Sequence, residues 1–265
     1  MESFYKNKVT IITGSSMGIG KEIAYQILML GGKVVLTGRN EERLIATKNE
    51  FSKYSESILI HVGDITNYEN NALMIKNTVT HFGKIDVLIN NAGLSCFGEI
   101  GVMNHDVAKQ IIDANIYGSL FPVMAALPEL KKTKGSVLFV SSLAGIHGLP
   151  GYSAYSLSKM SLKALAQSLN AELKLEKVFV GISYVGFTEN DKNKKTLSPN
   201  GSWINVPSRP KIITNSKKQT ALKLLMQIKN KKHSEVQTIV GTIINKFNQF
   251  FPSIFNSILK LNYQK

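Results

Sequence analysis

The chain has 265 residues, of which 43% are hydrophobic and 19% charged, so its composition excludes a disordered protein and fits a single α/β domain of ordinary size. Its one cysteine, Cys96, excludes an internal disulfide framework and a cysteine-rich zinc site, and it fits a reducing, cytoplasmic setting. The net charge of +14 is uneven, because residues 189–265 hold 14 Lys or Arg and 3 Asp or Glu, whereas residues 1–188 hold 18 and 15.

Two alternating patterns fill the first 188 residues. Short runs rich in Val and Ile, bounded by glycine or polar turns, predict buried strands at Lys8–Thr13, Lys33–Thr37, Ile58–Val62, Ile85–Asn90, Ser136–Ser141 and Val178–Val185. Stretches with helical periodicity lie between them, at Gly20–Leu30, Asn40–Tyr54, Tyr68–His81, Asp106–Lys132 and Ser153–Leu175. Repeated β-α-β units require right-handed crossovers, so the pattern predicts a doubly wound parallel sheet covered by helices on both faces.

The pattern loosens after the sixth strand. Gly186–Asn215 contains three prolines among polar residues, and we expect a long loop there, over the carboxyl edge of the sheet. A helix near Ser216–Lys229 and a last strand near Val236–Val240 complete the predicted fold. We therefore expect one domain over residues 1–240, with a lid at about 187–230.

A glycine-rich turn joins the first strand to the first helix, with the sequence Thr-Gly-Ser-Ser-Met-Gly-Ile-Gly at residues 13–20. Glycines let the backbone turn sharply and approach a pyrophosphate, which the positive end of the following helix stabilises. Tight packing of a helix on a strand also requires glycine, so such a turn alone is a weak signal. Its place between the first strand and the first helix strengthens it and predicts a dinucleotide site.

The residues after the second strand bear on the choice of dinucleotide. Sites that prefer NAD carry an acid here for the ribose hydroxyls, whereas this chain has Thr37-Gly38-Arg39-Asn40 and no carboxylate. The planar guanidinium of Arg39 suits a 2′-phosphate, although a solvated arginine at the start of a helix is the plainer alternative. We expect NADP(H) to be favoured over NAD(H).

Three polar residues form the most specific pattern. Tyr155 and Lys159 are four residues apart in a helical stretch and share one face, and Ser142 ends the fifth strand thirteen residues before Tyr155. A tyrosine titrates near pH 10, too high for acid/base work at neutral pH, but an adjacent ammonium favours the phenolate. Ser142 is placed to hydrogen-bond a substrate oxygen. Taken singly, each residue is better explained as core, solvated face or turn; the combination predicts catalysis.

Together these motifs resemble those of the short-chain dehydrogenase/reductases. The turn at residues 13–20, Asn-Asn-Ala-Gly at 90–93 and Tyr155-x-x-x-Lys159 with Ser142 upstream occur in the family's order and spacing, over about residues 7–190. The resemblance implies a Rossmann-type fold in three α/β/α layers, a single domain, and a nicotinamide-dependent oxidoreductase. It also implies a homodimer or homotetramer.

Further roles follow from the resemblance alone. Asn115 matches the position whose backbone supports a water-linked proton relay to Lys159, which completes a catalytic set with Ser142 and Tyr155. Asp64 matches the residue that contacts adenine. The expected cofactor-binding residues are Gly14, Ser15, Ser16, Met17, Gly18, Ile19, Gly20, Arg39, Asp64, Ile65, Asn91, Ala92, Gly93, Tyr155, Lys159, Gly186 and Thr188.

The chain departs from the family pattern after the sixth strand. Val185-Gly186 stands where Pro-Gly is usual, and Asn190 where a threonine is common. Beyond residue 186 the lysine-rich loop and the tail resemble bacterial relatives of the dehydrogenase/reductase member 7 group. That wider group acts on lipid-like, steroid or retinoid carbonyls, which implies an apolar carbonyl substrate.

The tail, residues 241–265, is basic and amphipathic. Its apolar residues fall at helical spacing, with a break at Pro252: Ile243, Ile244, Phe247, Phe250, Phe251, Ile254, Phe255, Ile258 and Leu259. One interpretation is an interfacial segment that lies peripherally on the inner membrane surface, its lysines meeting anionic head groups. The other, which we favour slightly, is a terminal helix pair that packs on the lid, the domain or a sister subunit.

Other kinds of partner have less support. Nucleic-acid binding is disfavoured because the lysines are not interleaved with a recognition motif. No metal is expected, because the five histidines show no metal-ligand spacing, and no run of 18 or more apolar residues suggests a membrane span. His147 and Tyr152, between Ser142 and Tyr155, are placed to line a substrate pocket.

The sequence thus predicts an NADP(H)-dependent oxidoreductase that interconverts a ketone or aldehyde and an alcohol, as a reductase of an apolar or lipid-like carbonyl. A rival from another class is a non-catalytic NADP-binding sensor, or a membrane-recruited scaffold, on the same fold. The intact set of four polar residues argues against the rival, because a pure binder needs none of them.

Overall fold

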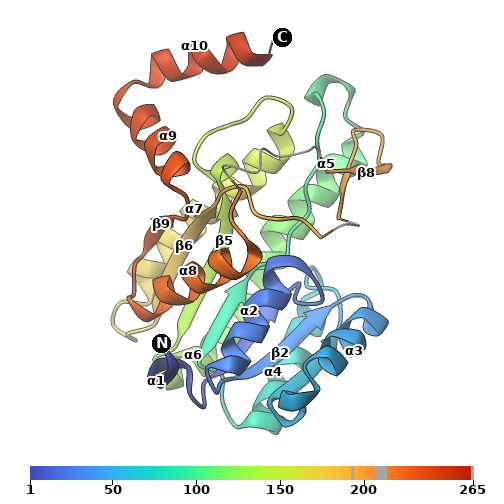
Figure 1. Cartoon of the computed structure of the whole chain (residues 1–265), viewed down its shortest axis with the longest axis vertical. Coiled ribbons are helices and arrows are strands. Elements are labelled where there is room, and N and C mark those ends of the chain that lie inside the picture. Colours follow the sequence, from blue (N-terminus) through green and yellow to red (C-terminus); the bar gives the residue numbers. More distant parts are fainter. Residues whose placement is uncertain (192–193, 207–213, 264–265) are drawn as a thin grey trace.

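The computed structural model of the protein describes residues 1–191, 194–206 and 214–263. Seven strands form one parallel sheet in the order β3-β2-β1-β4-β5-β6-β9 (Figure 1). Their bounds are β1 Val9–Thr13, β2 Lys33–Gly38, β3 Ile58–Val62, β4 Val87–Asn90, β5 Ser136–Ser142, β6 Phe179–Val185 and β9 Ser234–Val236. Every residue of β1, β4 and β6 is buried, because both faces of the sheet are covered.

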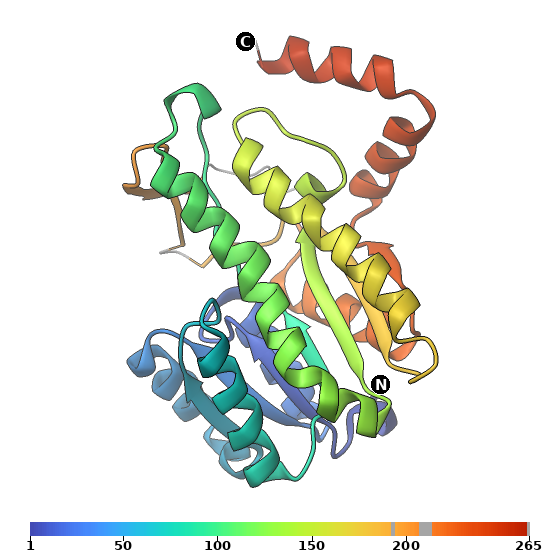
Figure 2. The same ribbon diagram turned by 180° about the vertical axis from the view of Figure 1, so that it is seen from behind.

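Six helices form the two outer layers of the sheet. The helices of the described residues have the bounds α1 Glu2–Tyr5, α2 Gly18–Met29, α3 Glu41–Glu50, α4 Tyr68–Phe82, α5 His105–Ile112, α6 Gly118–Thr133, α7 Ser153–Glu172, α8 Lys217–Lys229, α9 Ile239–Phe250 and α10 Pro252–Tyr263. Helices α2, α3 and α8 cover the face seen in Figure 1, and α4, α6 and α7 cover the face seen in Figure 2. The predicted three-layer, doubly wound, Rossmann-type fold is confirmed. The strand order reverses between β1 and β4, and such sheets bind ligands outside the carboxyl ends of the strands at that point.

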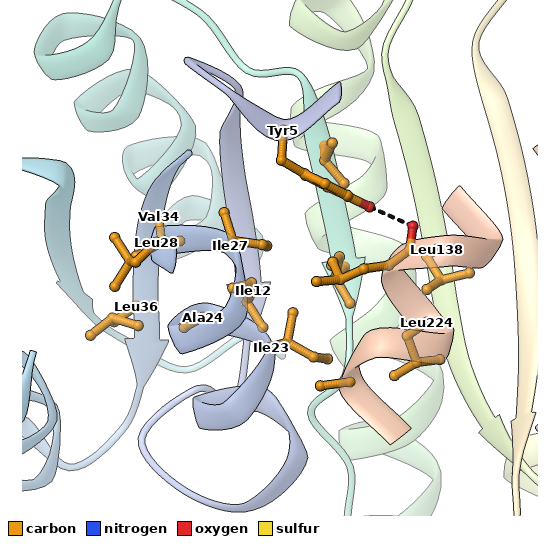
Figure 3. Close-up of a cluster of buried hydrophobic side chains, with 14 of the residues drawn as sticks. Tyr5, Ile12, Ile23, Ala24, Ile27, Leu28, Val34, Leu36, Leu138 and Leu224 are labelled. Carbon is orange, nitrogen blue, oxygen red and sulfur yellow. Dashed lines mark hydrogen bonds between the residues drawn. The ribbon is translucent and has the colours of Figure 1, made fainter. Parts of the chain in front are cut away.

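Figure 3 shows how apolar spacing specifies one of these layers. Ile23 and Ile27, four residues apart on α2, belong to one buried cluster with Leu224 of α8. The hydroxyl of the fully buried Tyr5 donates a hydrogen bond of 2.8 Å to the carbonyl oxygen of Leu225. This bond satisfies a buried polar group and ties the N-terminal helix to α8.

The last strand differs from the prediction. β9 covers Ser234–Val236, and residues 239 and 240, expected in the strand, begin α9 instead. The reason is the cap of that helix: the Thr238 hydroxyl accepts a hydrogen bond of 3.1 Å from the Gly241 N–H. The apolar residues 239 and 240 therefore form the first turn of a helix and not the end of a strand.

The expected long loop at Gly186–Asn215 contains a short hairpin, so the prediction of a loop is wrong for the two strands of that hairpin. Strand β7 (Lys195–Leu197) pairs antiparallel with β8 (Trp203–Asn205). Leu197 is buried in a small cluster with Cys96 and Val107, which gives the hairpin a core of its own. Residues 192–193 and 207–213 of the expected loop lie outside the described residues.

One long helical run follows the fourth strand. By length and composition, His105–Thr133 is the run among the described residues that is apolar enough to cross a membrane. A covering helix of a soluble sheet passes the same test, and this run contacts α4, α7 and β4. It is interrupted by a π-helical turn at Asp113–Tyr117, a feature that often marks a functional site.

The C-terminal part forms two helices that meet at Pro252, as the sequence predicts. Both views show α9 and α10 extending away from the sheet, with α10 running across the end of the molecule farthest from the N-terminus (Figures 1 and 2). The lid at about 187–230 and the boundary between residues 240 and 241 stay predictions.

Candidate active site

The glycine turn between β1 and α2 has room for no larger residue at its ends. Gly14 and Gly18 adopt positive φ angles of 65° and 60°, which favour glycine. A Cβ added to Gly20 would lie 2.4 Å from the Gly14 carbonyl oxygen and 2.5 Å from Asn91 Nδ2. Ser15 is buried beneath the turn, where its hydroxyl donates to the Ile12 carbonyl oxygen at 2.8 Å. Gly14 and Gly18 therefore place no side chain over the backbone of the turn, while Ser15 and Gly20 hold its shape.

The turn after β4 fastens the glycine turn to the sheet. Asn91 Nδ2 donates to the carbonyl oxygen of Thr13 at 2.9 Å and to that of Gly14 at 3.2 Å. The Thr13 hydroxyl accepts from the N–H groups of Asn91 and Ala92 at 2.9 and 3.0 Å. The two turns form one rigid floor at the switch point of the sheet.

Gly93 makes the space for two of the predicted catalytic residues. A Cβ there would lie 2.9 Å from Asn115 Oδ1 and 3.0 Å from Lys159 Nζ. Asn115 is fully buried on the π-helical turn. Its Oδ1 accepts from Leu94 N at 2.7 Å, and its Nδ2 donates to Ser158 Oγ at 2.8 Å. Asn115 thus joins the β4 turn to α7.

Lys159 is buried on α7 with its ammonium at the centre of this arrangement. Its Nζ donates to the Val140 carbonyl oxygen at 3.1 Å and lies 6.0 Å from the centroid of the Tyr155 ring. Burial, with a smaller contribution from the charge of Lys194, lowers the pKa of Lys159 to about 8. The half-buried Tyr155 lies one helical turn before Lys159, and both line the same pocket.

Ser142 reaches this pocket from the end of β5. Its hydroxyl accepts a hydrogen bond of 3.3 Å from Ala144 N. Ser142 thereby caps the short 3₁₀ turn Leu143–Gly145. Helix α7 lies close against this turn, since a Cβ on Gly145 would be 2.8 Å from the Lys159 carbonyl oxygen. The structure therefore brings Ser142, Tyr155 and Lys159 together around one cavity.

Two arginines line the far end of the pocket, beyond β2. Arg39 was predicted there, and Arg43 was not. Asn40 caps α3 by accepting from Arg43 N at 2.7 Å, so Arg43 lies in the first turn of the helix. In the sequence, Asn40 is a typical helix cap, and a helix that starts there has Arg43 in its first turn. This signal could have identified Arg43 as a second arginine beside Arg39. Asp64 also lines this end, its carboxylate accepting from Thr66 N at 2.8 Å.

The N-terminus of α2 already meets a carboxylate of the chain. Asp191 Oδ2 accepts from the Gly18 N–H at 2.7 Å, and Asp191 Oδ1 pairs with Lys217. Burial alone would raise the pKa of Asp191, but the hydrogen bond and charge of Lys217 lower it. A pyrophosphate at this helix end would compete with Asp191 for the Gly18 N–H.

Gly186 and Thr188, the two cofactor-binding residues predicted after β6, lie in different surroundings in the structure. Gly186 lines the pocket, and a Cβ there would lie 2.8 Å from Thr238 Cγ2. Thr188 is buried, with its hydroxyl 3.1 Å from that of Thr220 on α8. The Thr188 side chain therefore reaches toward α8.

One large pocket, with a volume of about 1540 Å³, connects the glycine turn and the two arginines to Ser142, Tyr155 and Lys159. Ser15, Gly20, Asn115 and Thr188 do not line it. The pocket volume exceeds the roughly 300–1,000 Å³ usual for small-molecule sites and leaves room for a dinucleotide and a second molecule. His147 and Tyr152 line it as the sequence suggests. Trp203 of the hairpin and Val240 and Ile244 of α9 also line it, and the sequence reading did not place them there.

The residues present fit a nicotinamide dinucleotide. The glycine turn carries no side chain at Gly14 and Gly18 beside a helix N-terminus, where a pyrophosphate would have to displace Asp191 from the Gly18 N–H. The arginines lie beyond this turn, at the adenosine end of such a site. Among the described residues, His, Cys, Asp and Glu form no cluster of three or more that could hold a metal ion.

The chain matches the profile of the family described as short chain dehydrogenase over residues 8–200. It is 34% identical over 196 residues to a 3-dehydrosphinganine reductase of Danio rerio, covering 69% of this chain and 59% of that protein. It is 35% identical over 203 residues to the 11-beta-hydroxysteroid dehydrogenase-like 4A protein of Arabidopsis thaliana, covering 75% and 67%. The chain thus matches less than two thirds of the length of the first of these relatives.

Solved structures share the fold over nearly the whole chain. A short chain dehydrogenase from Burkholderia cenocepacia, in complex with NADP, has a TM-score of 0.81 at 21% identity and covers 96% of this chain and 98% of its own. A short chain dehydrogenase/reductase from Burkholderia phymatum, in complex with NAD, has a TM-score of 0.81 at 17% identity, covering 94% and 95%. The chain therefore belongs to the short-chain dehydrogenase family, whose oxidoreductases use a nicotinamide cofactor on alcohol and carbonyl groups.

Proposed function

We propose that the protein is an NADP(H)-dependent reductase of apolar or lipid-like ketones or aldehydes, with Tyr155 as the proton donor. The observation that carries the proposal is the buried Lys159 ammonium, one helical turn from Tyr155, in the pocket that the glycine turn also lines. A buried lysine costs folding free energy, so its retention here requires a role.

Each member of the proposed catalytic set has a distinct task. The bound nicotinamide supplies the hydride, which adds two electrons to the carbonyl carbon. Tyr155 gives its phenolic proton to the carbonyl oxygen, so that an alcohol is formed. The Lys159 ammonium stabilises the phenolate that remains, and Ser142 donates a hydrogen bond to the substrate oxygen. Asn115 holds α7 against the β4 turn and fixes the position of Lys159.

The preference for NADP(H) rests on the end of β2. Residues 37–40 hold no carboxylate, whereas Arg39 and Arg43 both line the pocket there. Two guanidinium groups suit the doubly charged 2′-phosphate and have no counterpart on NAD(H). We therefore assign both arginines to the 2′-phosphate.

An apolar substrate is supported by the lining of the pocket that contains Tyr155, which includes Leu143, Leu149, Val185 and Ile244. The relatives named above are a 3-dehydrosphinganine reductase and an 11-beta-hydroxysteroid dehydrogenase-like protein. The proposal extends to a homodimer or homotetramer, and to a cytoplasmic protein whose tail contacts an anionic membrane surface.

The test is a Tyr155→Phe variant in an NADPH oxidation assay with short and long-chain ketones. NADPH binding should stay within about twofold of wild type, while turnover falls at least about a thousandfold, since general acid catalysis and its orientation are lost together. Normal turnover in the variant would rule out the assigned proton donor. Tight NADPH binding by the wild type with no turnover on a broad carbonyl panel would favour the non-catalytic sensor or scaffold.

A further inference from the structure

The first tail helix, α9, leaves a stripe of apolar side chains uncovered. Ile239, Ile243 and Phe250 are 80%, 62% and 73% exposed. They are four and seven residues apart, so they share one face of the helix. Monomeric proteins seldom expose a contiguous apolar face of this kind without a partner for it.

The second tail helix, α10, repeats this arrangement. Ile254, Ile258 and Leu261 are between 42% and 64% exposed and again share one face. Phe255, on another face, is buried, and its ring lies 4.6 Å from that of His147. One side of α10 is therefore fixed to the protein, and another side is open.

The neighbouring face of α9 is part of the candidate active site. Val240 and Ile244 line the pocket that contains Tyr155. Helix α9 lies directly on the turn after Ser142, since a Cβ on Gly241 would be 2.7 Å from Leu143 Cδ2. The exposed stripe and the pocket wall are thus adjacent faces of a single helix.

A second part of the pocket wall, at His147, also contacts the tail. His147 lines the pocket and makes the edge-to-face ring contact with Phe255 of α10. Its Nδ1 is buried and finds no hydrogen-bond partner among the described residues. A displacement of α10 would therefore reach the substrate end of the pocket through this ring contact.

The charge of the tail points to one kind of partner. Residues 236–265 contain no Asp or Glu, and the two tail lysines whose side chains are described, Lys246 and Lys260, are exposed. Lys229, Lys231 and Lys232 precede α9 and are exposed as well. A second copy of this chain would bring an equally basic surface against it, which is unfavourable, whereas anionic lipid head groups complement it.

We propose that α9 and α10 insert their exposed stripes into an anionic lipid surface, and that α9 forms the wall along which a long-chain carbonyl passes from the lipid to Tyr155. The second half rests on the proposed function, because it takes Tyr155 as the reacting group. The first half, the lipid contact, depends only on the tail.

The experiment compares the wild type with the triple variant Ile243→Ser, Phe250→Ser, Ile258→Ser, whose changes are all on exposed stripe positions. The matched control is Ile45→Ser, Leu73→Ser, Leu175→Ser, which removes three exposed apolar residues from the body of the protein. Each full-length protein is floated with phosphatidylcholine vesicles with and without phosphatidylglycerol. Each is then assayed with a long-chain ketone embedded in the vesicles and with a short water-soluble ketone.

We expect the triple variant to lose at least about a hundredfold in binding to the anionic vesicles, while the control stays within about twofold. Its KM for the embedded ketone should rise at least about tenfold, with kcat/KM for the short ketone within about twofold of wild type. Replacing Lys246 and Lys260 with Gln should weaken binding to anionic vesicles alone, by about fivefold per lysine.

Equal vesicle binding by the triple variant and the control would overturn the lipid contact. So would a wild type that ignores vesicles but is a dimer, with the triple variant a monomer, because the stripe would then be a subunit interface. Equal KM values for the embedded ketone would overturn the entrance along α9. If neither ketone is reduced while vesicle binding behaves as expected, the proposed function fails and the lipid contact stands.

Discussion

Helices α7 and α9 carry similar apolar periodicity, and the structure uses it in opposite ways. Leu162, Ala166 and Leu169 of α7 are buried against the sheet. Ile239, Ile243 and Phe250 of α9 are exposed on one face. The spacing of apolar residues therefore predicts that a face is covered, but it does not say what covers it.

The same contrast applies to lysines. Lys159 of α7 is buried, and its ammonium donates to the Val140 carbonyl oxygen inside the protein. Lys246 and Lys260 of the tail helices are exposed beside apolar stripes. In the body the chain supplies every partner that these groups need, whereas in the tail the partner must come from outside. The predictions below separate the two cases.

After Tyr155→Phe, the largest effect on turnover is expected in the body of the protein, at Gly93. In Gly93→Ala the new Cβ would lie 3.0 Å from Lys159 Nζ and 2.9 Å from Asn115 Oδ1, so both groups must shift by a few tenths of an ångström. Displacement of a catalytic group by about 1 Å can cost roughly a hundredfold, so we expect kcat to fall by up to about that factor. Gly101→Ala is the control, since a Cβ there meets no described atom within 4 Å. Equal kcat values in the two variants would show that Lys159 tolerates displacement.

The next effect concerns the arginines at the end of β2. Arg39→Gln with Arg43→Gln should reduce the preference for NADPH over NADH by about 10–100-fold, as expected when charge-assisted hydrogen bonds are lost. The change should appear in the KM for NADPH, because these groups are far from the reacting carbonyl. An unchanged ratio of kcat/KM for the two cofactors would remove both arginines from the 2′-phosphate site.

A smaller effect is expected in the pH dependence. Reduction requires the Lys159 ammonium, whose pKa burial lowers to about 8, so activity should be full near pH 7 and fall as the pH rises through about 8. Over the same range the unfolded chain binds more protons than the folded one, so the free energy of unfolding should rise with pH. Lys194→Gln should move the midpoint of the activity profile upward, because the Lys194 charge lowers the pKa of Lys159. A midpoint unmoved in this variant would exclude Lys159 as the titrating group.

Most of the body was predictable because each of its elements is locally marked. The strands are unbroken Val- and Ile-rich runs, and the glycine turn stands between strand and helix, so the fold and its switch point follow from local pattern. The family was also predictable, since the Tyr155 and Lys159 pair and Ser142 are close in sequence. The roles assigned to these residues remain predictions.

The features missed by the sequence reading depend on contacts distant in the chain. Asp191 reaches Gly18 across 173 residues, and Leu197 of the hairpin packs against Cys96. Val240 and Ile244 line the pocket because α9 lies on the turn after Ser142. The local spacing of apolar and polar residues does not predict contacts between segments that are distant in the chain. The Thr238 cap is a local signal, but residues 239–240 also suit a strand, so local pattern alone does not decide between the two.

The smallest effect should be on the stability of the tail variant, and it tests the opening comparison directly. Leu138→Ala truncates a side chain that is fully buried in the sheet and should lower the free energy of unfolding by about 2–5 kcal/mol. Ile243→Ala removes a similar side chain from an exposed stripe and should change the free energy of unfolding by no more than about 0.5 kcal/mol in the absence of lipid. Urea unfolding followed by circular dichroism measures both. A loss above about 2 kcal/mol at Ile243 would mean that the chain itself covers this stripe, and the distinction between the body and the tail would disappear.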